Sequence, residues 1–210
     1  MSVSEEREVQ PSPSPAPAPA LAVADPAPLG LAAFALTTFL LSAANAGWMT
    51  KATGSAWLGY AFAYGGLAQL LAGMWEFRNK NVFGATAFST YGGFWIGLGL
   101  WVELVAPHAP SAAAASHDVA WILLAFAVFN TYMLILSTQT NTAVFAVFLT
   151  LELTEIILFI GNFSGSSGTV KFGGYVGLVT ALTAWYASAA LVSRGVGGKL
   201  QFPVGKALIS

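Results

Sequence analysis

Six long apolar segments occupy most of this 210-residue chain, and they decide which solvent it folds in. Hydrophobic residues make up 56% of the sequence and charged residues only 8%, which are too few charges to cover a water-soluble surface. A helix needs about 20 apolar residues to cross roughly 30 Å of hydrocarbon. Runs of that length, bounded by charge, Pro or Gly, lie at residues 28–48, 56–75, 83–105, 119–137, 142–161 and 172–192. The sequence therefore predicts an all-α integral membrane protein with six transmembrane helices.

The chain divides into three parts by composition. Residues 1–24 are first acidic and then Pro-rich, a composition that favours extended, disordered chain. Residues 25–193 hold all six apolar segments and form one transmembrane domain. Residues 194–210 form a short basic tail.

The distribution of Lys and Arg predicts the orientation, because basic residues next to helix ends stay on the cytoplasmic side. Six spans put both termini on one side. Near the predicted helix ends, that side carries Arg78, Lys80, Arg194, Lys199 and Lys206, and the other side carries Lys51 and Lys171. We expect both termini to be cytoplasmic and the protein to lie in the cytoplasmic (inner) membrane.

The segment from Ala106 to Asp118 is then an outward-facing loop, and it carries both histidines of the chain. Two histidines without further ligands are typical of solvated loop residues, although His108 and His117 could also sense pH or bind a metal.

Several classes of protein are excluded. The chain has no Cys, which rules out disulfides and thiolate metal sites. It carries no phosphate-binding loop, zinc-protease helix or serine-hydrolase elbow, so we expect no enzyme activity and no cofactor. The few basic residues are scattered, and we expect no nucleic acid as a partner.

Two Gly-x-x-x-Gly motifs predict close helix contacts, because helices in lipid approach each other through small residues. Gly93 and Gly97 form one motif, Gly173 and Gly177 form the other, and an aromatic-Gly-Gly step overlaps the start of each. The likeness is consistent with two inverted three-helix halves, and equally with plain packing or an oligomer contact.

The segment from Asp25 to Leu31 predicts an abrupt helix entrance. Pro28 lacks an N–H that would be unpaired at a helix start anyway, and Pro26 keeps the preceding chain extended. Unpaired N–H groups at Leu29, Gly30 and Leu31 would face the cytoplasmic mouth and favour a carboxylate. The alternative is a capped helix that binds nothing, with Asp25 as the cap.

The same segment, Asp-Pro-Ala-Pro-Leu-Gly-Leu followed by Phe34, resembles the N-P-A-P-L-G-L signature of the acetate uptake transporter family, which includes bacterial succinate-acetate permeases and their fungal relatives. Further matching stretches are Tyr64–Gln69, Met74–Phe77, Phe83–Phe88, Tyr91–Trp95 and Ile160–Asn162. The resemblance covers roughly residues 25–192. In one departure, Asp25 stands where the family has Asn, and its charge would repel an incoming anion.

The resemblance implies a six-helix protomer, a homo-hexamer in the lipid bilayer, and a substrate path through each protomer. Phe34, Tyr91 and Leu151 match the hydrophobic constriction of that path. An apolar ring of this kind can exclude water and ions yet pass a small, partly apolar molecule. On sequence grounds alone, the three residues are also consistent with ordinary core packing.

Polar side chains inside the spans are candidates for substrate contacts, because such groups are costly in lipid. Uncharged donors suit a carboxylate that must be held and then released. The candidates are Thr38, Asn45, Gln69 and Thr90, while Ser and Thr can instead bond back to their own helix. We expect Glu76, near Arg78 and Lys80, to form an interfacial ion pair.

Glu152 and Glu155 lie next to Leu151 in the fifth apolar segment. Glu155 follows Leu151 by four residues and so shares its helix face. A carboxyl group buried there could carry a proton alongside the anion. The two residues could instead lie in a subunit interface or bond to Thr154 and neighbouring helices.

Together these features predict a transporter of acetate and other short carboxylates, including succinate, with proton-linked uptake as a hypothesis. Two other functions stay open: a pore for ammonia or ammonium, and a membrane sensor that transports nothing and whose Pro-rich tail recruits a cytoplasmic partner.

Overall fold

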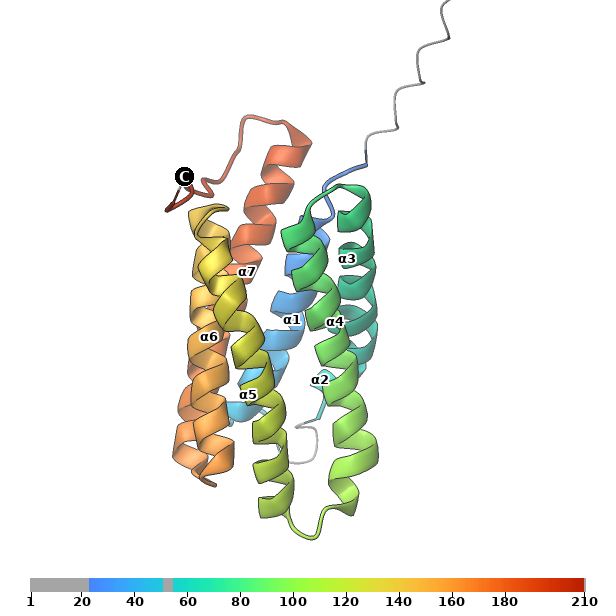
Figure 1. Ribbon diagram of the computed structural model, residues 1–210, viewed down its shortest axis with the longest axis vertical. Coiled ribbons are helices and arrows are strands. Elements are labelled where there is room, and N and C mark those ends of the chain that lie inside the picture. The colour runs from blue at the N-terminus through green and yellow to red at the C-terminus, as the bar shows by residue number, and fades with distance from the viewer. Residues whose placement is uncertain (1–22, 51–54, 210) are drawn as a thin grey trace, which may run out of the picture.

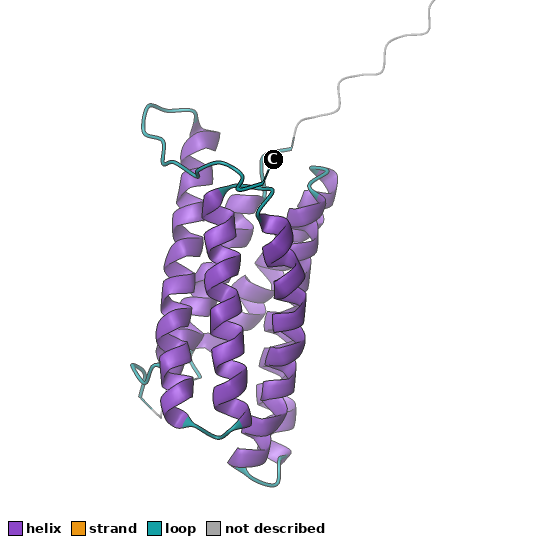
Figure 2. Ribbon diagram, turned by 60° about the vertical axis from the view of Figure 1, so that its left-hand side comes forward, coloured by secondary structure: helices purple, strands orange, loops and turns teal. Residues whose placement is uncertain are grey.

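The computed structural model describes residues 23–50 and 55–209 (Figure 1). Most of the predicted disordered tail and Lys51 lie outside the described residues. Helices occupy all six predicted ranges, and no strand occurs in the described part of the chain (Figure 2). The elements are α1 (Ala27–Asn45), α2 (Trp57–Phe62), the π-helix η1 (Ala63–Ala68), α3 (Gln69–Arg78), α4 (Val82–Leu100), the π-helix η2 (Trp101–Val105), the 3₁₀-helix η3 (Ala106–His108), α5 (Ala112–Ser137), α6 (Thr142–Phe163) and α7 (Ser167–Val196).

Four helices, α1, α5, α6 and α7, are each long and apolar enough to cross a membrane. The protein is therefore a multi-pass membrane protein. The helix in the fourth predicted range, α5, is longer than predicted: it begins at Ala112 rather than at Val119. Ser111 caps this early start by accepting a hydrogen bond from the Ala114 N–H (3.1 Å).

The second predicted range is not a regular α-helix. A π-helical segment, η1, separates α2 from α3 at the Tyr64-Gly65-Gly66 stretch. A Cβ atom at Gly65 would lie within 2.9 Å of Thr37 side-chain atoms, so this backbone passes very close to α1. Such π-helical turns are irregularities that periodicity alone does not reveal.

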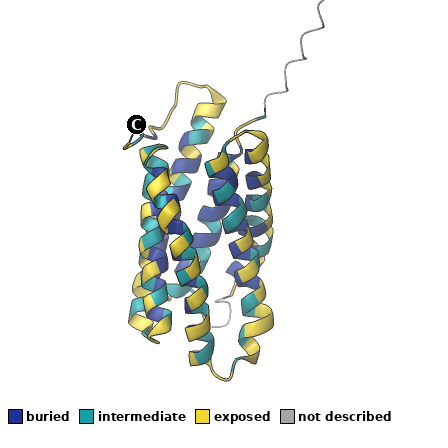
Figure 3. Ribbon diagram, viewed as in Figure 1, coloured by how far each residue is buried: buried dark blue, intermediate teal, exposed yellow. Residues whose placement is uncertain are grey.

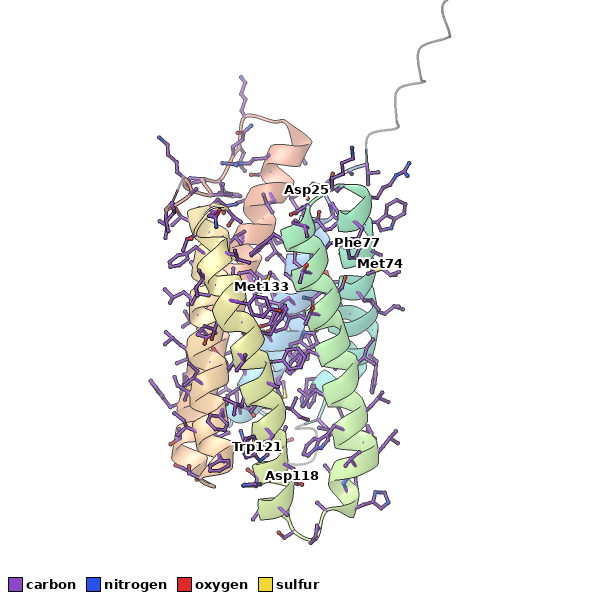
Figure 4. All side chains as sticks on the ribbon, in the orientation of Figure 1. Asp25, Met74, Phe77, Asp118, Trp121 and Met133 are labelled. Atoms are coloured by element: carbon purple, nitrogen blue, oxygen red, sulfur yellow. The ribbon has the colours of Figure 1, made fainter. Side chains whose placement is uncertain are left out.

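The helices pack into one bundle and run along its long axis (Figure 1). Asp25, the turn between α3 and α4, and the C-terminal segment lie at one end, and Asp118 and Trp121 lie toward the other (Figure 4). We name these the Asp25 end and the Asp118 end. The chain therefore enters and leaves the bundle at the same end, as an even number of crossings requires.

The outer surface of the bundle is apolar. Exposed residues cover its periphery and buried residues its interior (Figure 3), and Met74 and Phe77 on α3 are 46% and 60% exposed. Large apolar residues are also exposed on the outer helices, among them Val128, Ile135, Leu153 and Val179. A surface of this kind suits lipid or a neighbouring subunit.

The two Gly-x-x-x-Gly motifs differ in their surroundings. A Cβ atom at Gly173 would lie 2.7 Å from Leu158, and one at Gly177 would collide with Ser42, so this motif packs α7 against α6 and α1. Gly93 and Gly97 face open space instead. In α4 the close contact is made by the neighbouring Gly92, which lies against the backbone of Leu70.

The two histidines lie at the Asp118 end, and one of them is not in a loop. His117 belongs to α5, and its ring centroid lies 4.8 Å from that of Phe163. His108 closes η3, with Nδ1 3.0 Å from the Leu104 carbonyl oxygen. The predicted outer loop is therefore shorter than residues 106–118.

Replacing Gly174 by Val should destabilise the fold. Its Cβ atom would lie 2.5 Å from Ala46 N and 2.8 Å from Ser42 O, which are backbone atoms of α1 and its C-terminal end that cannot move aside. Overpacking of this kind costs about 1–3 kcal/mol. We expect a lower melting temperature and less monodisperse protein in detergent. Gly93→Val is the matched control, because it makes the same change at a helical position open to its surroundings; equal losses in both variants would contradict the close contact.

Candidate functional site

Phe34, Tyr91 and Leu151 meet inside the bundle, from α1, α4 and α6. Their exposed fractions are 4%, 3% and 6%. The Phe34 and Tyr91 rings contact each other edge to face, with centroids 5.6 Å apart. The three residues named from the resemblance therefore form one apolar cluster, which we call the constriction.

A small cavity lies on each side of the constriction, and Phe34, Tyr91 and Leu151 line both. The Asp118-side cavity has a volume of about 40 Å³ and continues along α1 to Asn45. The Asp25-side cavity has a volume of about 20 Å³ and reaches Gln69. The constriction separates two spaces that each hold only a few atoms.

A larger vestibule of about 320 Å³ opens at the Asp25 end. Polar residues line it, namely Asp25, Asn79, Asn81, Thr140 and Asn141. Leu31 and Phe88 line both this vestibule and the Asp25-side cavity. Vestibule, cavity, constriction and second cavity thus follow one another through the bundle.

The predicted entrance site has a different structure from the one expected. The helix begins at Ala27, one residue before Pro28, and the Gly30 N–H donates to the Pro26 carbonyl (3.1 Å). Gly30 therefore offers no free N–H group to an anion. Asp25 Oδ1 accepts from the Ala27 N–H (2.9 Å), so Asp25 is bonded to the first residue of the helix, although Pro26 and not Asp25 occupies the N-cap position.

The other substrate-contact candidates divide into two groups. Thr38 and Asn45 line the Asp118-side cavity, and Gln69 lines the Asp25-side cavity. Leu31 lines both the Asp25-side cavity and the vestibule. Leu29, Gly30 and Thr90 line none of these three spaces. Leu29 is 45% exposed, and Gly30 packs against the Phe88 ring.

Several buried polar atoms at the two cavities have no hydrogen-bond partner in the protein. They are Thr38 Oγ1, Trp95 Nε1 and Glu155 Oε2 on the Asp118 side and Gln69 Oε1 on the Asp25 side. Buried polar groups normally have partners, so these atoms are available to a ligand. Sequence reasoning missed Trp95, although an indole N–H in an apolar helix is itself a signal, because it needs an acceptor.

The Tyr91 hydroxyl is the centre of a polar cluster within the apolar interior. It lies 3.1 Å from Asn130 Oδ1 and 3.2 Å from Glu155 Oε1. Asn130 Nδ2 donates to the Phe148 carbonyl (2.9 Å) and to Glu152 Oε2 (2.7 Å). Glu152 Oε1 also accepts from Thr131 Oγ1 (2.8 Å). Hydrogen bonds thus join residues of α4, α5 and α6 next to the constriction.

The two glutamates of α6 lie in different environments. Glu155 is 3% exposed and lines the Asp118-side cavity together with Leu151, on the helix face that the spacing predicts. Glu152 is partly exposed and contacts α5. Neither bonds to Thr154, whose hydroxyl instead contacts the Thr150 carbonyl and Thr180.

The expected ion pair at Glu76 does not form. This side chain is fully buried, and Glu76 Oε2 accepts from Asn79 Nδ2 (3.3 Å). Among the described residues the only contact between a basic and an acidic side chain is that of His117 Nδ1 with Asp118 Oδ1 (3.4 Å). Because α3 turns this carboxylate inward beside Gly84, it cannot reach the exposed ends of Arg78 and Lys80.

Comparison with known proteins gives relatives of named function. The succinate-acetate/proton symporter SatP of Escherichia coli is 33% identical over 183 residues, which cover 87% of this chain and 95% of SatP. A solved structure of the bacterial acetate channel SatP superposes with a TM-score of 0.80 at 32% identity, covering 88% of this chain and 100% of that one. Ammonia transport outward protein 2 of Saccharomyces cerevisiae is 37% identical over 175 residues, or 81% of this chain.

The chain spans only 62% of the length of that yeast relative, so the relative has substantial sequence beyond the shared part.

The model of the GPR1/FUN34/yaaH family matches residues 7–204. This match covers nearly the whole chain, including all helices around the constriction. The protein belongs to the GPR1/FUN34/yaaH family, as its signature motifs predict.

Proposed function

We propose that this protein moves acetate, and other short carboxylates including succinate, across the cytoplasmic membrane through the constriction. The observation that carries the proposal is the pair of small cavities meeting at Phe34, Tyr91 and Leu151. An apolar bottleneck opposes the passage of hydrated ions by dewetting, and a two-carbon acid is small and half apolar. SatP, named for acetate in both comparisons, has the same fold.

The polar groups beside the constriction fit a transported carboxylate. Thr38 Oγ1 and Trp95 Nε1 are uncharged donors that lack partners in the protein, whereas the unpartnered Gln69 Oε1 is an acceptor that fits only the protonated acid. No Lys or Arg lines either cavity among the described residues. A fixed cation would hold a carboxylate tightly, whereas uncharged groups allow it to bind and leave, which conduction requires.

The proposed assembly is a homo-hexamer of six-span protomers with cytoplasmic termini. The segments from α2 to α3 and from α4 to η2 would supply the two spans beyond the four apolar helices. The basic residues of the α3–α4 turn and the C-terminal segment support a cytoplasmic Asp25 end. Apolar faces on the outer helices leave room for neighbouring subunits.

The direct test is uptake of radiolabelled acetate into proteoliposomes that contain the purified protein, compared with empty liposomes. We expect uptake that saturates or is competed by unlabelled acetate and succinate. Correctly folded protein without uptake above the empty control would contradict transport and favour the sensor function.

Leu151→Ala should widen the bottleneck. Removing this side chain takes away one wall of the constriction and part of the barrier to larger acids. We expect several-fold faster uptake of butyrate, with a smaller change for acetate. Leu153→Ala is the matched control, because Leu153 lies two residues away on α6 and is 49% exposed. A butyrate rate that is equal in the two variants would argue against the constriction.

Glu155→Gln should flatten the pH dependence of acetate uptake if uptake is proton-linked. Glu155 lines the Asp118-side cavity, with the titratable groups of Tyr91 on α4 and Glu152 on α6 nearest to it. Gln keeps the shape of Glu but cannot exchange a proton. The control is Glu103→Gln at an exposed position of η2. A pH profile identical to that of the unmodified protein, at equal protein levels, would remove Glu155 from the mechanism.

A second candidate, transport of ammonia or ammonium, is favoured by the name of the yeast relative. Competition experiments separate it from acetate transport. If uptake of labelled acetate is reduced by succinate and unaffected by methylammonium, the carboxylate function holds. Uptake of labelled methylammonium that acetate does not compete would favour the second candidate.

A further inference from the structure

The Tyr91 ring is part of the constriction, and its hydroxyl group is held from two other helices. Asn130 on α5 and Glu155 on α6 both contact this hydroxyl, at 3.1 Å and 3.2 Å. Tyr91, Asn130 and Glu155 are each at most 3% exposed. These contacts are therefore made without competition from water.

The orientation of the Asn130 amide follows from its neighbours. Its Nδ2 faces two acceptors, the Phe148 carbonyl and a Glu152 carboxylate oxygen. An amide nitrogen has two hydrogens, so both contacts are satisfied in this orientation only. Asn130 Oδ1 is then an acceptor pointing at Tyr91, and the Tyr91 hydroxyl donates to it.

The contact with Glu155 holds the same hydroxyl from α6. The Tyr91 hydroxyl donates toward Glu155 Oε1 (3.2 Å) as well as toward Asn130 Oδ1 (3.1 Å). A phenol has one hydrogen, which these two acceptors share. Both acceptors therefore direct the hydroxyl toward α5 and α6.

The Tyr91 ring also contacts four aromatic rings. Phe34, Phe94, Phe126 and Phe129 surround it, with centroid distances of 5.6, 6.1, 5.9 and 5.5 Å. Ring contacts of this kind are weakly directional and tolerate a swing of the side chain. The hydroxyl contacts are directional, so they determine whether the ring stays across the passage.

We propose that Asn130 and Glu155 form a hydrogen-bonded lock that holds the Tyr91 ring across the passage and so limits the size of the acid that passes. The lock rests on the proposed transport function. Asn130 acts through Tyr91 and is a positioning residue, and Glu152 in turn fixes Asn130. An acid larger than acetate passes only when Tyr91 swings away and gives up these contacts.

The test measures the ratio of butyrate to acetate uptake in proteoliposomes for Tyr91→Phe and Asn130→Leu. Tyr91→Phe keeps the ring and removes only the hydroxyl, and Asn130→Leu removes the acceptor with little change in volume. We expect each variant to raise the ratio by up to about tenfold, the effect of one net hydrogen bond. Because both rates come from one preparation, the ratio does not depend on the amount of active protein.

Two further variants sharpen the test. Tyr60→Phe is the matched control, because Tyr60 is 49% exposed and its ratio should stay unchanged. The double variant of Tyr91→Phe with Asn130→Leu should raise the ratio no more than the larger single change, since both remove the same contact.

The outcomes separate the lock from the function on which it depends. Acetate uptake by the unmodified protein together with an unchanged ratio in either variant overturns the lock and leaves the transport function standing. Effects that add in the double variant also overturn it, because the two residues would then act independently. Absence of any acetate uptake by the unmodified protein overturns the transport function, and the lock with it.

Discussion

The structure depends on one constraint: a polar side chain inside a bilayer finds its partner within the protein or has none. Several buried hydroxyls of this bundle meet the constraint locally, as Thr37 and Thr154 do by donating to carbonyl oxygens one turn earlier. Among the described residues six side-chain atoms are exceptions, and four of them, on Thr38, Gln69, Trp95 and Glu155, line the two cavities at the constriction, while those on Glu76 and Ser89 do not. Most of the unsatisfied groups thus lie along the proposed path of a polar solute.

The position of the constriction depends in turn on small residues far from it in sequence. Gly174 and Gly177 let α7 lie directly against α1, near Ser42 and Ala46. That contact fixes the position of α1 in the bundle, and α1 places Phe34 and Thr38 at the Asp118-side cavity. Side chains at these glycines would push α1 away from α7 and change the width of the bottleneck without touching it. Helix packing and the width of the constriction are therefore coupled in this fold, because α1 takes part in both.

Sequence reasoning located the helices well and their irregularities poorly. Helices occupy all six predicted ranges, since apolar length is a strong signal, and the shared face of Leu151 and Glu155 follows from their spacing. The π-helical turn at Gly65, the early start of α5 and the inward turn of Glu76 could not be read, because each depends on a neighbouring segment. Apolar residues face both lipid and core, so the pattern alone does not say which face is buried. Asn130 is a candidate from its sequence alone, as a polar residue inside a span, but its partners, like the candidacy of Trp95, became known only with its surroundings.

Asp25 stands where the family signature has Asn, and the geometry of Asp25 explains why this difference has a limited effect. Before the N-cap residue Pro26, Asp25 makes the contact that Asn could also make, because its Oδ1 accepts from the Ala27 N–H. Its charge lies at the rim of the vestibule, where it is exposed to solvent. Two unit charges 4 Å apart in water interact by about 1 kcal/mol, and salt screens the interaction beyond roughly 8 Å. Asp25 lines the vestibule and neither cavity at the constriction, so for the proposed anion transport this charge acts on entry from the Asp25 end rather than on passage through the bottleneck.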